Sequence, residues 1–253
     1  MITIKTPAEI EKIRQACRVV AQVLQNIEKE IKIGITTEEL DRFAEDLILK
    51  CNCSPAFKGY RGYTHSTCIS VNFQVVHGIP SKLKLKDGDI VSFDVGTVFE
   101  GYYGDGARTF PVGNVSGAAR KLLSTTKEAL KKAISQARYG KNLGDISYTI
   151  EKVAADAGFS VVKDLFGHGV GNHLHEDPLI PNFGKRGTGA KLKAGMVLAI
   201  EPMLNMGRSR VITLDDGWTV ATEDRMLSAH FEDTIVVTDG DPEILTKAFS
   251  NKG

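Results

Sequence analysis

Two aspartates lie close together in the stretch "SFDVGTVFEGYYGDGART", which begins at Ser92. Strand-like sequence on both sides of Phe99-Glu100-Gly101 predicts a β-hairpin, and this hairpin would place Asp94 and Asp105 nearly opposite each other. Like charges across a strand pair repel, and an unpaired ionised carboxylate in a protein interior is very costly. The arrangement therefore predicts a bound cation.

The same pattern occurs a second time in the chain. "LKDGDIVSFD" aligns without a gap with "LKAGMVLAIE", so Asp94 corresponds to Glu201. "DGARTFPVG", which begins at Asp105, aligns with "EDTIVVTDG", which begins at Glu232. About twenty extra residues separate the second pair, and we assign them to a longer loop and an extra strand around Asn205 to Arg225. Two similar halves about an approximate twofold axis would bring the four carboxylates together.

Three histidines have settings that suit this chemistry. His168 in "FGHGVG" has glycines on both sides, which let the backbone approach a crowded centre, so we expect a nitrogen ligand here unless the ring is merely structural. His77 in "VVHGIP" and His175 in "NHLHEDP" stand in predicted loops at strand ends. Carboxylates with imidazoles around divalent ions predict a hydrolase that activates water. The other three histidines are expected to be surface or packing residues: His65, His173 and His230.

Helices must hold these strands in place. "TPAE" is a capping box that opens a long amphipathic helix at Thr6, which we expect Gly34 to stop, and "TTEE" opens a shorter helix. After the hairpin, helical patterns run from Ser116 or Gly117 to about Arg138 and from Gly144 to Ala157. The predicted fold is α+β, a single domain over residues 1–253. Its halves are expected at about 1–115 and 116–245, with a central antiparallel sheet covered by helices.

Composition restricts the class of protein. The chain has 253 residues, 42% of them apolar, and a net charge of +1, so no overall attraction to nucleic acid or an anionic membrane is expected. The start has no secretory signal pattern, and four cysteines are too few for a disulfide scaffold, which indicates a cytoplasmic protein. "CNC" at Cys51 to Cys53 is an alternative half of a zinc site, but no second pair follows at the usual spacing.

Seven motifs together resemble one known family. "VVHGIP", "FDVG", "GYYGDGARTF", "GHGVG", "HEDP", "IEPM" and "HFEDTIVVT", in this order and spacing, are similar to those of the type I methionine aminopeptidases, which have the pita-bread fold. The resemblance extends from the first helix to Asp239. It implies a metalloprotease that removes the initiator methionine from nascent proteins and peptides when the second residue is small.

The resemblance also implies roles for individual residues. Two divalent ions, manganese, iron, cobalt or zinc, would be held by five ligands, of which Asp105 and Glu232 bridge the ions. Glu201 would also be the general base for a water bound by both ions, and His175 would hydrogen-bond the scissile carbonyl. His77 would contact the peptide nitrogen or the leaving side. The five implied ligands are Asp94, Asp105, His168, Glu201 and Glu232. In some relatives a monovalent cation lies beneath the site, here near Asn72 and Ser228.

The family's methionine pocket corresponds to a partly aromatic set of residues. Such side chains suit a polarisable thioether, although Tyr60, Tyr63 and Trp218 could instead cover the edges of the core. Leu174 and Phe57 depart from the residues expected beside the pocket, which puts its depth in question. The implied pocket residues are Tyr60, Tyr63, Cys68, His77 and Trp218.

The resemblance also implies binding partners, and two alternative functions have to be weighed against it. The resemblance implies the N-terminal methionine of nascent chains as substrate, transient association with the ribosome, no nucleic-acid recognition of its own, no membrane and a monomer. One rival is a proline-directed peptidase of the same fold, although we expect no room for an extra domain before Thr6. A second rival is a non-catalytic binding protein that has lost its metals, although all five implied ligands are present.

Overall fold

A computed structural model describes residues 1–247 of the chain. The described residues form four α-helices and a short 3-10 helix: α1 (Pro7–Glu30), α2 (Thr37–Lys50), η1 (Tyr60–Gly62), α3 (Gly117–Ile134) and α4 (Leu143–Asp156). The strands are β1 (Ser54–Pro55), β2 (Thr67–Val71), β3 (Gln74–Val76), β4 (Ile90–Phe99), β5 (Tyr102–Pro111), β6 (Ser160–Val161), β7 (Phe166–Gly169), β8 (Glu176–Pro181), β9 (Val197–Ile200), β10 (Met203–Asn205), β11 (Val211–Thr213), β12 (Val220–Thr222), β13 (Ser228–His230), β14 (Glu232–Val236) and β15 (Glu243–Ile244).

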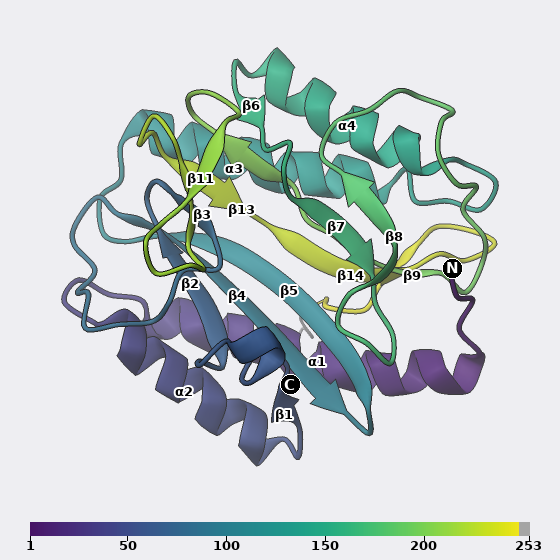
Figure 1. The fold of residues 1–253 in the computed structure, drawn as a ribbon, viewed down its shortest axis with the longest axis horizontal. Coiled ribbons are helices and arrows are strands. Elements are labelled where there is room, and N and C mark those ends of the chain that lie inside the picture. The colour runs from purple at the N-terminus through teal and green to yellow at the C-terminus, as the bar shows by residue number, and fades with distance from the viewer. Residues whose placement is uncertain (248–253) are drawn as a thin grey trace, which may run out of the picture.

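One large sheet runs through both halves of the chain. Its nine strands follow the order β1-β4-β5-β14-β9-β7-β8, with β2 beside β4 and β15 beside β14 (Figure 1). The central pair, β5 and β14, is antiparallel and joins the two halves. β4 flanks this pair on one side and β9 on the other, so equivalent strands of the two halves occupy equivalent places in the sheet. The predicted α+β fold with a central antiparallel sheet is confirmed.

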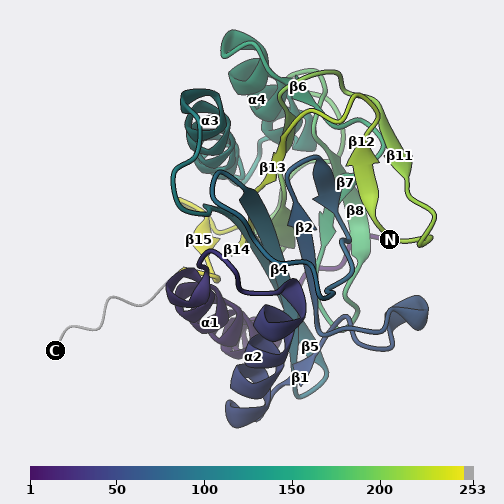
Figure 2. The same ribbon diagram turned by 90° about the vertical axis from the view of Figure 1, so that its left-hand side faces the viewer.

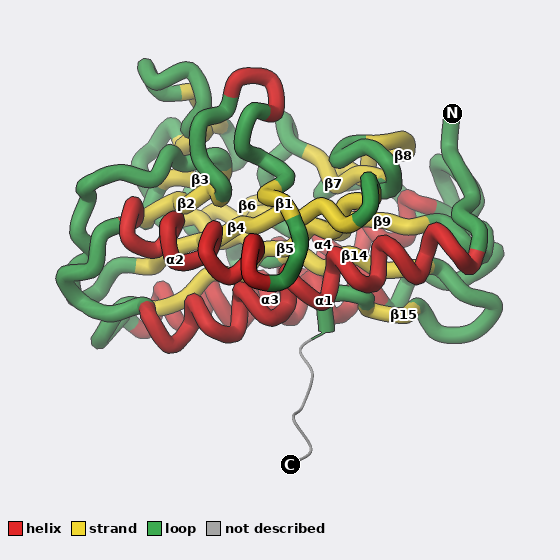
Figure 3. Tube along the Cα trace, turned by 90° about the horizontal axis from the view of Figure 1, so that it is seen from below, coloured by secondary structure: helices red, strands yellow, loops and turns green. Residues whose placement is uncertain are grey.

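The four helices cover the same face of this sheet. They form one layer below the strands, whereas loops and η1 lie above them (Figure 3). Figure 2 shows α1 and α2 side by side against the strands of the first half, and α3 and α4 against those of the second. Each pair buries its own apolar cluster, one around Leu24 and Phe93 and another around Leu122 and Ile146. Burial of these side chains holds the helices against one face of the sheet and leaves the opposite face to the loops.

Local sequence explains where the helices begin. Thr6 and Thr36 each accept a hydrogen bond from the backbone N–H three residues later, and the carboxylates of Glu9 and Glu39 accept one from the N–H of the cap residue. Both are capping boxes; the one at Thr6 was predicted as such, and the one at Thr36 begins the predicted second helix. No helix within residues 1–247 is long and apolar enough to cross a membrane.

Three element boundaries differ from the prediction. α1 ends at Glu30, before Gly34, because Ile31 already has an extended backbone with ψ 114°. α3 ends at Ile134, four residues before Arg138, where the chain tightens into short turns such as Gln136 N–H to Ala133 O. The inserted segment of the second half forms two strands, β11 and β12, because β12 finds a partner in β3 of the first half.

Candidate active site

The β4–β5 hairpin fixes the first two carboxylates. Its two-residue turn uses Glu100 and Gly101, both in the left-handed region with φ 48° and 78°, as a tight hairpin of this length requires. The register pairs Asp94 with Ala107 and Gly96 with Asp105. Because residues two apart on a strand point to the same face, both carboxylates point to one face of the sheet, two positions apart.

The second half adds the remaining carboxylates on that face. Glu232 pairs with Ala107 across β5 and β14, so Asp94 and Glu232 flank the same small residue. Ile200 of β9 pairs with Asp233, which brings Glu201 opposite Glu232 one step further along. Four neighbouring strands of the sheet, two from each half of the chain, therefore gather four acidic side chains, as the repeat predicts.

Glycines let His168 enter this group. β7 pairs His168 with Ala199 of β9. A Cβ on Gly167 would lie 2.5 Å from Ala199 O, and one on Gly169 would lie 2.2 Å from Asp177 O, so only glycine fits on either side. The ring is held by a hydrogen bond from Nδ1–H to the carbonyl of Gly169 at 2.9 Å. This bond leaves the Nε2 lone pair free to face the carboxylates.

The distances suit ligands of a common cation better than direct hydrogen bonds. His168 Nε2 lies 3.6 Å from Glu201 Oε1 and 3.8 Å from Asp105 Oδ2. One ligand atom each from Asp105, His168 and Glu232 lies within 4.8 Å of the other two. Two carboxylate oxygens, Asp94 Oδ1 and Glu232 Oε1, are buried and have no hydrogen-bond partner among the residues described. Oxygen and imidazole donors of this kind fit a hard or borderline divalent cation.

The pKa shifts of these side chains indicate that the cluster lacks a positive charge. Burial raises the pKa of Asp94 to about 7. Burial, followed by the charges of neighbouring carboxylates, raises the pKa of Asp105, Glu201 and Glu232 well above the usual range. Burial also lowers the pKa of His168 to about 4, which keeps its ring neutral. Without positive charge the site holds protons, and a cation would favour the ionised carboxylates.

A cavity of about 340 Å³ opens above these residues. All eleven residues that the sequence predicts for the site line it, as do Phe57 and Leu174, the two positions that depart from the family. The lining also contains three residues that the sequence analysis did not select, Arg61, Val76 and Leu179. The predicted residues are Tyr60, Tyr63, Cys68, His77, Asp94, Asp105, His168, His175, Glu201, Trp218 and Glu232.

His175 and His77 reach the cavity from opposite loops. The ring of His175 lies 4.3 Å from that of His168, centroid to centroid, and its Nδ1 is 2.9 Å from the Tyr60 hydroxyl. Desolvation, and then the neighbouring imidazoles, lower the pKa of His175 to about 3. His77 follows β3 with φ 58°, a left-handed conformation that is uncommon outside glycine. Such strain is typical of functional positions.

Aromatic residues form the far wall of the cavity. Tyr63 meets Trp218 edge to face with ring centroids 5.0 Å apart, and its hydroxyl donates to the carbonyls of Thr67 and Gly78. Asp41 of α2 fixes the same loop by accepting hydrogen bonds from the backbone of Thr67. The pocket wall is therefore anchored to the helical layer.

The structure places one of the remaining histidines beside the cluster. His230, which we expected to be a surface or packing residue, is buried, with Nε2 3.8 Å from both Glu201 Oε2 and Glu232 Oε2. The available signal was its position two residues before Glu232, which places both side chains on the same face of an extended chain. His173 is exposed and His65 lies beside Tyr63, as expected.

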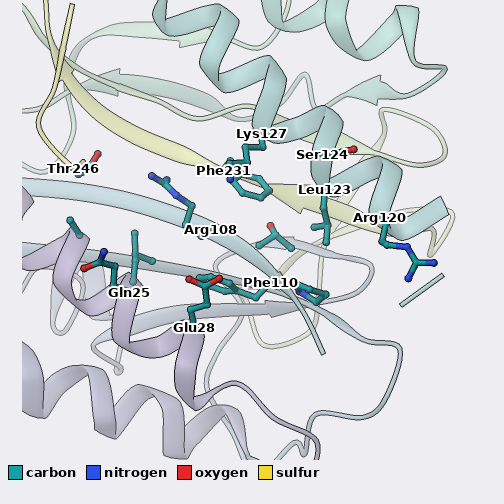
Figure 4. Close-up of a pocket in the computed structure, with 14 residues that line it drawn as sticks. Gln25, Glu28, Arg108, Phe110, Arg120, Leu123, Ser124, Lys127, Phe231 and Thr246 are labelled. Carbon is teal, nitrogen blue, oxygen red and sulfur yellow. The ribbon is translucent and has the colours of Figure 1, made fainter. Parts of the chain in front are cut away.

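A second hollow, of about 500 Å³, lies on the helical side of the sheet. α3 contributes Arg120, Leu123 and Lys127 to it, and α1 contributes Gln25 and Glu28, as Figure 4 shows. None of the described residues that line it is a histidine, cysteine or aspartate. All eleven candidate site residues line the other cavity instead.

Known proteins share this architecture and sequence. Residues 11–239 match metallopeptidase family M24. The chain is 52% identical to the methionine aminopeptidase of Clostridium perfringens over 246 residues, which cover 97% of this chain and 99% of that protein.

Two solved structures extend the comparison. Methionine aminopeptidase from Thermotoga maritima superposes with a TM-score of 0.96 at 49% identity, covering 98% of this chain and 100% of that one. Prolidase from Pyrococcus furiosus superposes with a TM-score of 0.80 at 26% identity, covering 98% of this chain and 66% of that one.

Proposed function

The chain belongs to metallopeptidase family M24, and from this premise we propose that it removes the N-terminal methionine from peptides and nascent proteins. It is a metal-dependent hydrolase with the pita-bread fold of the methionine aminopeptidases and prolidases that it matches. We assign the whole of residues 1–253 to one catalytic domain, with halves at about 1–115 and 116–245.

The observation that carries the proposal is the composition of the 340 Å³ cavity. A cluster of carboxylates and imidazoles forms its floor, and an aromatic wall of Tyr63 and Trp218 stands beside them. The floor suits water activation, and the wall suits an apolar, polarisable side chain such as methionine. Identity near 50% to methionine aminopeptidases over nearly the whole chain supports the same substrate.

The floor would hold two divalent cations. Asp94, Asp105, His168, Glu201 and Glu232 are the proposed ligands, and Asp105 and Glu232 come from the two central strands of the sheet. When bound, such ions acidify a water and polarise the peptide carbonyl. Manganese, iron, cobalt and zinc all accept these donors. A monovalent cation near Asn72 and Ser228, whose backbone groups are hydrogen-bonded at 2.9 Å, is part of the same proposal.

The side chains around the floor would carry the remaining chemistry. Glu201 accepts the proton of the attacking water as general base. His175 Nδ1 lies 2.9 Å from the Tyr60 hydroxyl; in the tautomer in which Nδ1 accepts this hydrogen bond, the neutral imidazole carries its proton on Nε2 and would donate it to the scissile carbonyl oxygen as charge develops. His77 contacts the peptide nitrogen or the leaving side. The substrate's amino terminus lies near Asp94, which selects chain ends over internal bonds.

The methionine side chain would occupy the space between the aromatic wall and Cys68. Tyr60, Tyr63, Cys68, His77 and Trp218 all line that part of the cavity. Burial, followed by the charge of Asp94, raises the pKa of the Cys68 thiol, so it stays an uncharged apolar neighbour for a thioether. We further propose that a small second residue is required, since the leaving side faces the floor and its histidines.

We place this activity in the cytoplasm, with a monomer that meets nascent chains at the ribosome. All four cysteines carry free thiols, which is typical of a reducing compartment. A substrate generated during translation supports the same location.

The test is methionine release by chelator-treated protein that is titrated with each candidate ion. We expect Met-Ala-Ser to be cleaved after addition of one or more of manganese, iron, cobalt or zinc, and Met-Leu-Ser much more slowly. Ala-Pro-Ala is the control for a proline-directed peptidase.

Two outcomes would contradict the proposal. Preferential cleavage of Ala-Pro-Ala would assign prolidase-like specificity. Protein that binds no divalent ion by calorimetry and releases no methionine would support the non-catalytic alternative.

A further inference from the structure

His230 is a buried histidine at the edge of the carboxylate cluster. It is 1% exposed, and neither ring nitrogen has a hydrogen-bond partner among residues 1–247. Buried polar groups are normally hydrogen-bonded, because each unpaired one loses its hydration without replacement. The ring therefore requires a partner that it reaches in the working enzyme.

Contacts on both sides hold the backbone of His230. Its N–H donates to Thr109 Oγ1 at 2.9 Å, and the same hydroxyl donates to His230 O at 2.7 Å. On the other side, β13 pairs His230 with Met203 of β10. The main chain from which the ring extends is therefore fixed beside the cluster.

Two carboxylates lie within reach of Nε2. Glu201 Oε2 and Glu232 Oε2 are each 3.8 Å away, beyond hydrogen-bond range. The other oxygen of Glu201, Oε1, faces His168 at 3.6 Å. The Glu201 carboxylate thus lies between two imidazoles, one on each oxygen.

The two imidazoles occupy different sides of that carboxylate. His168, Glu201 and Glu232 line the cavity, whereas His230 does not. His230 therefore lies behind the carboxylates as seen from the cavity, where it can orient them without contacting substrate. Outer partners of this kind hold the carboxylates of metal sites in place.

We propose that His230 is a positioning residue that donates its Nε2–H to Glu201 Oε2 and so directs Oε1 toward the cavity. This inference rests on the proposed role of Glu201 as general base. Glu201 is the partner because it stands just beyond the end of β9, whereas Glu232 is held within β14. A hydrogen bond needs about 3.0 Å, so the two atoms have to approach by less than about 1 Å.

Three variants test the proposal in the manganese-loaded protein. His230→Gln keeps an N–H donor of similar reach, His230→Met keeps the volume without a donor, and His230→Asn keeps a donor that is too short. The measurements are kcat and KM on Met-Ala-Ser, manganese binding by calorimetry, and thermal unfolding.

We expect His230→Met and His230→Asn to lower kcat by about 10- to 100-fold. KM should change by less than about twofold, because substrate contacts are intact. His230→Gln should stay within about threefold of the wild-type kcat, because its amide replaces the lost donor. The number of manganese ions bound should be unchanged in all three, with affinity weakened in the Met and Asn variants only.

Specific results would overturn the proposal. If the Met and Asn variants kept the wild-type kcat and manganese affinity, His230 would be a packing residue without a positioning role. Loss of one bound manganese, not restored by Gln, would make His230 a ligand. If the wild-type protein itself releases no methionine, the proposed function fails. The manganese affinities of His230→Gln and His230→Asn, measured by calorimetry, would still test whether His230 orients Glu201. A weaker affinity in Asn than in Gln would support that role, and equal affinities would contradict it.

Discussion

Replacing Asp94 with asparagine should stabilise the metal-free protein at alkaline pH. Asp94 Oδ1 is buried and has no hydrogen-bond partner within the described part of the chain. Burial raises the pKa of this carboxyl from 3.8 to about 7, so its ionised form opposes folding when no cation is bound. Asparagine has a similar shape and removes that charge.

The size and sign of the effect follow from linkage. The folded pKa lies above the unfolded one, so the penalty is absent below pH 3.8, grows as the pH rises toward about 7, and is constant above that. Each pK unit corresponds to about 1.4 kcal/mol, which gives a full penalty of about 4 kcal/mol for Asp94. Between pH 5.5 and pH 8 the stability of the wild type should therefore fall by about 2 kcal/mol relative to the variant.

Urea unfolding of chelator-treated protein measures this difference. Circular dichroism and Trp218 fluorescence report the transition at pH 5.5 and pH 8, and the exposed Asp46→Asn is the matched control without a buried charge. Saturating manganese should reverse the order, because a bound cation stabilises the folded wild type more than the variant. The reasoning would be refuted if the gap between wild type and Asp94→Asn did not widen toward pH 8.

Three further predictions concern other parts of the site. Glu201→Gln should lower kcat for methionine release by about 10²- to 10⁴-fold, as expected for loss of a general base, and near-normal turnover in a stopped assay would exclude that role. Lys5→Met should lower the free energy of unfolding by about 1 to 3 kcal/mol, because it removes the charge partner, 2.6 Å away at Lys5 Nζ, of the half-buried Glu176 carboxylate beside the His175 loop. Urea unfolding checks this, and an unchanged midpoint would contradict it. Trp218→Ala should raise KM for Met-Ala-Ser about tenfold or more, because it removes the part of the proposed methionine pocket that packs against Tyr63. Steady-state kinetics measure this, and an unchanged KM would mean that Trp218 is a packing residue.

Much of the fold could be predicted because its signals are local. The capping boxes at Thr6 and Thr36 depend on residues three apart, and the Glu100-Gly101 turn depends on two residues that accept positive φ. The internal repeat predicted that the two halves bring four carboxylates together, because equivalent sequences pack in equivalent ways about a twofold axis. The ends of α1 and α3 were predicted less well, since helix termination depends on which neighbours compete for the last carbonyls.

The inserted hairpin of β11 and β12 depends on contacts that local sequence does not encode. Its second strand, β12, exists because β3 of the other half offers an edge, and that edge is more than 140 residues away in sequence. Arg61 of η1 and Leu179 of β8 line the cavity for the same reason, because elements distant in sequence bring them there.

The sequence by itself determined the chemistry of the site. Residue type and a period of two placed Asp94, Asp105, Glu201 and Glu232 on one face, and glycines on both sides allowed His168 to approach. Only the tertiary structure decided which of the remaining histidines belong to the site. His230 and His173 look alike along the chain, yet one is buried 3.8 Å from two carboxylates and the other is exposed. Whether a histidine is buried, and how far it lies from a carboxylate, depends on which residues pack around it, and most of those residues are far away along the chain.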